Sequence, residues 1–108
     1  MKTIVKLVNQ DIFIDPLSWV MDWTAPYFPK VGDTLNAGIF MNGCGMTPDV
    51  VVASLKDSYR ADWERDMNAY GRSPEIQLET FLNDIDLVII RVEWDMQDGQ
   101  TIAILYVD

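Results

Sequence analysis

The sequence contains no histidine and a single cysteine, Cys44. Without an imidazole, neither a Cys–His pair nor a Ser–His–Asp triad can form within the chain, and a reactive thiol would need a helix end or one basic side chain to lower its pKa. A lone cysteine forms no internal disulfide, and zinc sites require several Cys or His ligands. We therefore predict no catalytic residue, no metal site and no cofactor.

Long apolar runs and secretory features are also lacking. Stretches such as Leu87–Ile90 are much shorter than the roughly 18 to 20 apolar residues that cross a bilayer. The first residues, MKTIVKLVNQDIF, show neither a long apolar segment nor a small-residue cleavage site. Together with the single cysteine, these absences predict a cytoplasmic protein without membrane attachment.

Basic residues are scarce. The chain has eight Lys and Arg against 17 Asp and Glu, a net charge of −9 at pH 7. Residues 1–54 carry a balance of −2 and residues 55–108 a balance of −7, so the acidity belongs to the second half. Phosphate backbones and anionic membranes repel such a surface, which argues against direct nucleic-acid binding, whereas a basic protein is attracted to it. Solubility alone is the alternative explanation.

The sequence has enough apolar content for one folded domain. Of its 108 residues, 49% are hydrophobic, and four Trp, four Tyr and four Phe supply large units of burial. A chain of this length and composition encloses a hydrophobic core without disulfides or metals. We therefore expect a single domain that spans residues 1–108.

The C-terminal segment is typical of a β-hairpin. Apolar positions alternate with polar ones from Val88 to Trp94, and Asp98-Gly99 suits a tight turn before residues 101–107 return. The returning strand is apolar on both faces, which predicts a central position in its sheet. Two further strands are predicted by alternation, one over residues 2–8 and one over residues 34–41.

Two helices are predicted in the second half. In SPEIQLETFLND, Ser73 takes the N-cap position and Pro74 the first turn, and an apolar stripe follows. Residues 57–70 space their large apolar side chains by three or four residues and end before Gly71, a suitable C-terminal stop.

Residues 15–28 predict a third, short helix that begins at Asp15 and Pro16 and ends at a pair of prolines. Trp19 and Trp23, four residues apart, would then lie on one face of this helix. The two side chains can serve as core or as an interaction surface.

The segment FMNGCGMTPDVVV, residues 40–52, allows two structures. The three consecutive valines favour a strand over residues 50–55, so that the glycines form a hairpin connection to residues 34–41. Alternatively, Thr47 and Pro48 begin a long helix from about residue 48 to residue 70. We favour the strand, and we expect Cys44 to be a small residue in a turn rather than a nucleophile.

An acidic run lies within the predicted helix over residues 57–70. Asp62, Glu64 and Asp66 have the spacing of a calcium loop, but glycine is absent from the sixth position and glutamate from the twelfth. A solvated helix face, interleaved with Arg60 and Arg65, explains the run better.

These observations predict an α+β fold with a mainly antiparallel sheet of four or five strands that can curl into a half-barrel. Two or three helices and a C-terminal β-hairpin complete it. The favoured function is a small acidic, non-enzymatic protein-binding module of the inhibitor, immunity or adaptor type that docks a basic partner. The residues expected to bind this partner are Asp57, Asp62, Glu64, Asp66, Trp19 and Trp23.

Three other functions remain open at this point. An acidic mimic of DNA is disfavoured because arginines interrupt the negative surface in the second half. A structural role, in which the C-terminal strand or the Trp-rich segment joins copies into a homo-oligomer, is the first alternative. A small-molecule binder or a carboxylate-based enzyme is the second alternative, and it would require a concave pocket with perturbed Asp or Glu side chains.

Overall fold

Four strands form one mixed sheet in the order β2-β1-β4-β3 in the computed structural model, which describes residues 1–108. The strands are β1 (Lys2–Leu7), β2 (Leu17–Asp22), β3 (Ile89–Gln97) and β4 (Gln100–Val107). β1 and β2 pair antiparallel, as do β3 and β4, and parallel pairing of β1 with β4 joins the two hairpins. The predicted α+β class is confirmed, but the sheet is mixed rather than wholly antiparallel, and it does not close into a barrel.

The predicted C-terminal hairpin is confirmed. Asp98 and Gly99 connect β3 to β4 with φ angles of 50° and 77°, the left-handed conformation that a two-residue hairpin turn requires. β4 lies between β1 and β3, which is the central position that its two apolar faces predicted. The strand predicted over residues 2–8 is β1, which ends one residue earlier, at Leu7.

Two of the predicted helices are confirmed as α2 (Asp57–Tyr70) and α3 (Pro74–Asp84). α2 ends at Gly71, which has a φ of 60° and donates its backbone N–H into the last turn. The Ser73 hydroxyl accepts a hydrogen bond of 3.3 Å from the Ile76 N–H and so caps α3.

The helix predicted over residues 15–28 is wrong, because this segment forms β2 and then a loop. Ser18 and Val20 are exposed and Trp19 is half-buried, so the side chains alternate with period two. Residues four apart share one face in a strand as well as in a helix, and the Trp19 and Trp23 spacing therefore did not distinguish the two. Backbone pairing with the edge of β1 stabilises this segment as a strand and not as a helix.

The strand predicted over residues 34–41 is also wrong. Only Thr34 forms a β-bridge, to Val88, and a π-helix, η1 (Ile39–Gly43), follows. The burial of Leu35 and Ala37 matches the predicted alternation, but Phe40 is then fully buried in place of its neighbours. This segment wraps over the core, so its buried side chains stop alternating at every second residue. Tertiary packing therefore overrides the strand preference of the sequence.

The favoured strand over residues 50–55 is a helix, α1 (Pro48–Ser54), with Pro48 in its first turn. Val51 is fully buried while Val50 is exposed, so packing of one helical face outweighs the β-preference of the valines. The alternative of one continuous helix to residue 70 is wrong too, since Leu55 has an extended backbone that separates α1 from α2. The glycine-rich residues 43–45 therefore connect η1 to α1 and do not form a hairpin loop.

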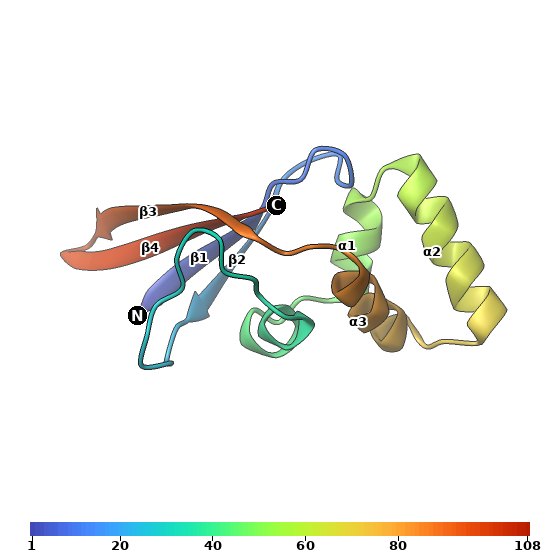
Figure 1. Ribbon diagram of the computed structural model, residues 1–108, viewed down its shortest axis with the longest axis horizontal. Helices are drawn as coiled ribbons and strands as arrows, with labels where there is room; N and C mark the ends of the chain where they lie inside the picture. Colours follow the sequence, from blue (N-terminus) through green and yellow to red (C-terminus); the bar gives the residue numbers. More distant parts are fainter.

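The sheet occupies one end of the molecule and α1, α2 and α3 the other, with η1 between them (Figure 1). The molecule measures 48 × 25 × 24 Å as a result. One core joins the two halves: Val5, Leu7, Leu105 and Val107 of the sheet belong to the same buried cluster as side chains from all three α-helices. No helix of the structure is both long and apolar enough to cross a membrane.

Candidate functional site

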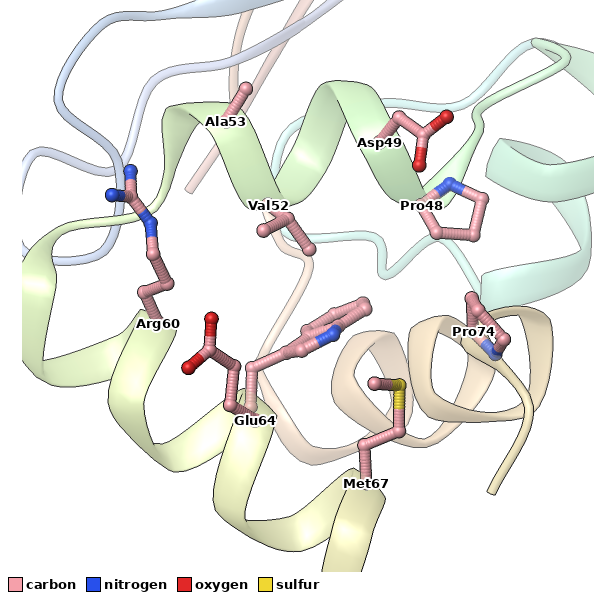
Figure 2. Close-up of a pocket in the computed structure, with 9 residues that line it drawn as sticks. Pro48, Asp49, Val52, Ala53, Arg60, Glu64, Met67 and Pro74 are labelled. Carbon is pink, nitrogen blue, oxygen red and sulfur yellow. The ribbon is translucent and has the colours of Figure 1, made fainter. Parts of the chain in front are cut away.

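A cavity of about 520 Å³ opens in the helical half, between α1, α2 and the first residue of α3 (Figure 2). We call it the helical cavity. Its lining combines apolar side chains with three charged ones. The lining residues are Pro48, Asp49, Val52 and Ala53 of α1, Arg60, Trp63, Glu64 and Met67 of α2, and Pro74 of α3.

α2 supplies one continuous wall of the cavity. Its four lining residues follow the i, i+3, i+4, i+7 spacing that places side chains on one face of a helix. Trp63 is only 4% exposed, and its ring meets the Phe81 ring of α3 edge-on at 5.5 Å. This contact fixes the indole between α2 and α3, so that part of the cavity lining is rigid.

Arg60 is held at the junction of α1 and α2. Its Nη2 donates to the Leu55 carbonyl, which ends α1, at 3.2 Å, while its Nε is buried without a hydrogen-bond partner. A buried donor without a partner loses its hydration and gains nothing in return. The contact with Leu55 therefore fixes the guanidinium beside the helical cavity, while its Nε keeps an unmet hydrogen-bonding capacity.

Glu64 lies one turn further along α2, and its carboxylate forms neither an ion pair nor a hydrogen bond within the chain. Figure 2 shows Arg60 and Ala53 toward one end of the helical cavity, Pro48 and Asp49 toward the other, and Glu64 and Met67 on the α2 side between them. The cavity thus presents one positive and two negative side chains around an apolar lining, and none of the three charged groups has an ionic partner within the chain.

The predicted acidic residues all lie on α2, but they have different surroundings. Asp62 and Asp66 pair with Arg65 at 3.1 Å and 3.4 Å, so their charges are partly neutralised. Asp57 is in the first turn of α2, where the helix dipole favours a negative side chain. Glu64 is the only one of the four that lines the helical cavity.

The predicted tryptophans lie in the sheet half, away from α2 (Figure 1). Trp19 is half-buried on β2 and packs against the core. The Trp23 ring meets Phe28 at 5.6 Å, and its Nε1 donates to the Tyr27 carbonyl at 3.0 Å. The structure therefore does not combine the predicted aromatic and acidic residues into one surface.

Cys44 is half-buried, and its Sγ contacts the Met21 Sδ at 3.6 Å. Burial raises the pKa of the thiol from 9.0 to about 11. The thiol is therefore protonated at neutral pH, which is the unreactive form.

Several lining residues were missed at the level of sequence. The spacing of Arg60, Trp63, Glu64 and Met67 was visible in the sequence, but it reads equally well as a helix that packs on a core. Pro48 and Pro74, each in the first turn of a helix, were recognised only as helix starts. Knowledge that α1 and α2 both pack on α3 and enclose the cavity between them is needed to bring these residues together, and the strand favoured over residues 50–55 prevented it.

Comparisons of this chain with protein-family models, with curated proteins and with solved structures found no match.

Proposed function

We propose that the protein is a non-enzymatic binding module whose helical half docks a basic segment of a partner protein. The observation that carries this proposal is the unpaired carboxylate of Glu64 on the wall of the helical cavity. Residues 48–86 also contain nine acidic and four basic side chains, a denser negative charge than the sheet carries. A surface of this sign attracts a basic partner and sets the salt dependence of its association.

In this proposal a Lys or Arg side chain of the partner enters the helical cavity. Its aliphatic stem packs on Val52 and Met67, and its cationic head faces Glu64 and Asp49. A backbone carbonyl of the docked segment accepts a hydrogen bond from Arg60, whose Nη2 alone is engaged in the free protein. Cys44, protonated at neutral pH, takes no part.

Because disulfides are absent and the only cysteine is a free thiol, we place this interaction in the cytoplasm. The sign of the surface charge also disfavours a nucleic acid as the docked molecule.

A random peptide library provides the test. We expect selected peptides to be enriched in Lys or Arg and to bind less tightly as salt rises. Glu64→Gln should weaken the best peptide about fivefold to tenfold, equivalent to about 1 kcal/mol for one partly exposed ion pair. Glu79→Gln removes the same charge from α3 outside the cavity and is the matched control.

Equal affinities for the Glu64→Gln and Glu79→Gln proteins would show that the cavity is not the docking site. Selection of peptides without basic residues would reject the proposed partner class.

A small-molecule binder is a second candidate, favoured by the size of the cavity. Its volume of about 520 Å³ lies within the roughly 300 to 1,000 Å³ that is common for small-molecule sites. Val52→Trp would place a large ring in the cavity and narrow it. Fragments that stabilise the wild-type protein but not the Val52→Trp variant, with no selection of basic peptides, would favour this second function.

A further inference from the structure

The outer edge of β3 is open over most of its length. β3 is the last strand of the sheet, and its own chain covers this edge only at the start. There the Ile89 N–H donates to the Asp33 carbonyl at 2.9 Å, and the Gly32 N–H donates to the Ile89 carbonyl at 2.9 Å. From Arg91 to Gln97 no strand lies on that side, and Figure 1 shows β3 at the border of the sheet.

This open edge also carries large apolar side chains. Trp94 is 55% exposed and Met96 is 67% exposed, both on the face of the sheet that bears the core. Phe28 packs on the Trp94 ring at 5.1 Å and extends the apolar surface. Soluble proteins usually protect an edge strand with charges, a proline or a covering loop, because unpaired backbone groups recruit another strand. Beyond residue 89 this edge has no paired strand and no proline, and its charged side chains lie on the face opposite Trp94 and Met96.

The opposite face of the same strand carries an ordered set of charges. Arg91, Glu93 and Asp95 alternate with the apolar residues, and Arg91 pairs with Glu93 within the chain. An antiparallel pair related by a two-fold axis keeps equivalent side chains on the same face of the extended sheet. If the axis passes at Glu93, Arg91 of each copy lies opposite Asp95 of the other. The two Glu93 side chains then face each other, and the neighbouring Arg91 of each copy offsets their repulsion.

Registers shifted toward the hairpin turn are less favourable. Centring the pair on Trp94 places Glu93 opposite Asp95 twice, and like charges directly opposite are destabilising. Centring it on Asp95 leaves Arg91 without an acidic residue opposite.

A register shifted the other way, about Val92, sets Arg91 opposite Glu93 but uses backbone that is already occupied. It would pair Trp94 with Ile90, next to the bulge between Ile89 and Arg91 and the edge that residues 32–34 cover. The register about Glu93 matches charge and pairs residues 91–95 of the two copies over open backbone, a longer open stretch than the register about Val92 allows.

We propose that β3 pairs antiparallel with β3 of a second copy of this chain and forms a continuous eight-stranded sheet. The other edge strand, β2, has a single charged residue, Asp22, and offers no self-complementary pattern. Contact through one strand and its flanking apolar residues is small compared with obligate dimer interfaces. The dimer is therefore concentration-dependent. This association is independent of basic-partner docking, which uses the opposite end of the molecule.

Charge reversal at the two paired positions tests the register. In the proposed dimer, position 91 of each copy faces position 95 of the other. With Arg91→Asp, two acidic side chains face each other at these positions. With Asp95→Arg, two arginines face each other there. Each variant alone should remain monomeric in analytical ultracentrifugation at concentrations where the wild-type chain is dimeric. An equimolar mixture should dimerise again, because the aspartate introduced in one variant then faces the arginine introduced in the other, and the native Arg91 faces the native Asp95.

Two matched controls carry the same changes of charge away from β3. Lys56→Asp, at the start of α2, and Asp15→Arg, before β2, should dimerise as the wild-type chain does. Circular dichroism should confirm that every variant is folded, and peptide binding at the helical cavity should be unchanged in the Arg91→Asp and Asp95→Arg proteins.

A wild-type chain that is monomeric up to millimolar concentration would overturn the proposal. So would dimerisation of each single variant alone, a mixture that stays monomeric, or assemblies that grow beyond the dimer, since growth would indicate pairing of β3 with β2.

Discussion

Arg60 and Glu64 lie one turn apart on α2, yet the guanidinium donates to the Leu55 carbonyl and the carboxylate has no ionic partner. Residues at this spacing commonly form an ion pair on a helix surface. In this protein Arg60 instead links α2 to the end of α1, and Glu64 remains available on the wall of the helical cavity. The contact of Arg60 with Leu55 therefore contributes to stability, and the unpaired Glu64 carboxylate contributes to the proposed docking.

Arg60→Ala should lower the free energy of unfolding by about 1 to 2 kcal/mol, because the variant loses a charged hydrogen bond and the packing of the arginine stem. Arg65→Ala is the control, since Arg65 makes only exposed ion pairs with Asp62 and Asp66. We expect it to cost less than about 0.5 kcal/mol. Urea unfolding of both variants measures the difference, and equal losses would show that the Leu55 contact contributes nothing.

Ser73→Ala should destabilise the protein by about 1 kcal/mol, because the hydroxyl caps the first turn of α3. Thr47 occupies the same position before α1 but makes no side-chain hydrogen bond to the helix. Thr47→Ala should therefore change the melting temperature much less than Ser73→Ala. A larger effect of the Thr47 substitution would contradict the capping geometry of both helices.

Phe28→Ala should lower the free energy of unfolding by about 2 kcal/mol, because its half-buried ring contacts two tryptophans. The rings of Trp23 and Trp94 lie 5.6 Å and 5.1 Å from that of Phe28. Their fluorescence emission should move to longer wavelength as water reaches them. Tyr27→Ala is the neighbouring control: its side chain is 81% exposed, and the carbonyl that binds Trp23 is retained. An unchanged spectrum in the Phe28 variant would refute the predicted exposure.

Cys44 should make stability fall at alkaline pH. Its pKa is raised from 9.0 in the unfolded reference to about 11 in the folded protein. Between these values the unfolded chain loses the proton while the folded chain keeps it, so ionisation favours unfolding. The contribution is complete below pH 9 and is lost as pH rises through 11. The free energy of unfolding of the wild-type protein, minus that of Cys44→Ala, should therefore decline over this interval.

Ionisation of Tyr106 should also lower the free energy of unfolding at high pH. Its hydroxyl donates to Glu93 Oε2 at 3.0 Å, and this hydrogen bond, together with burial and the charge of Glu93, raises its pKa. The Cys44 comparison should be repeated in a Tyr106→Phe background. A difference between the two proteins that stays constant from pH 8 to pH 11 in that background would exclude the thiol as the cause.

Elements with a local chemical signal were predictable from the sequence. Ser73-Pro74 marked the start of α3, Gly71 the end of α2, and Asp98-Gly99 the hairpin, because each of these needs a particular backbone conformation or hydrogen bond that few residues supply. The central position of β4 also followed from its two apolar faces.

Elements decided by tertiary contacts were not predictable. The valines of α1 and the tryptophans at positions 19 and 23 have intrinsic preferences or spacings that fit either structure, and partners distant in sequence select one of them. The candidate site depends on this outcome. Glu64 was predicted as a binding residue, but the cavity beside it exists only because residues 48–54 are helical, pack on α3 and face α2 across the cavity.

The parallel ladder between β1 and β4 joins residues about one hundred positions apart, since Thr3 pairs with Ala103 and Leu7 with Val107. Closing so long a loop is slow compared with forming either hairpin. During synthesis, β1 and β2 must wait with an unfilled edge until residues 100–107 leave the ribosome. The native sheet therefore forms only after β4 is available, and the waiting N-terminal hairpin is the species most exposed to aggregation or to capture by chaperones.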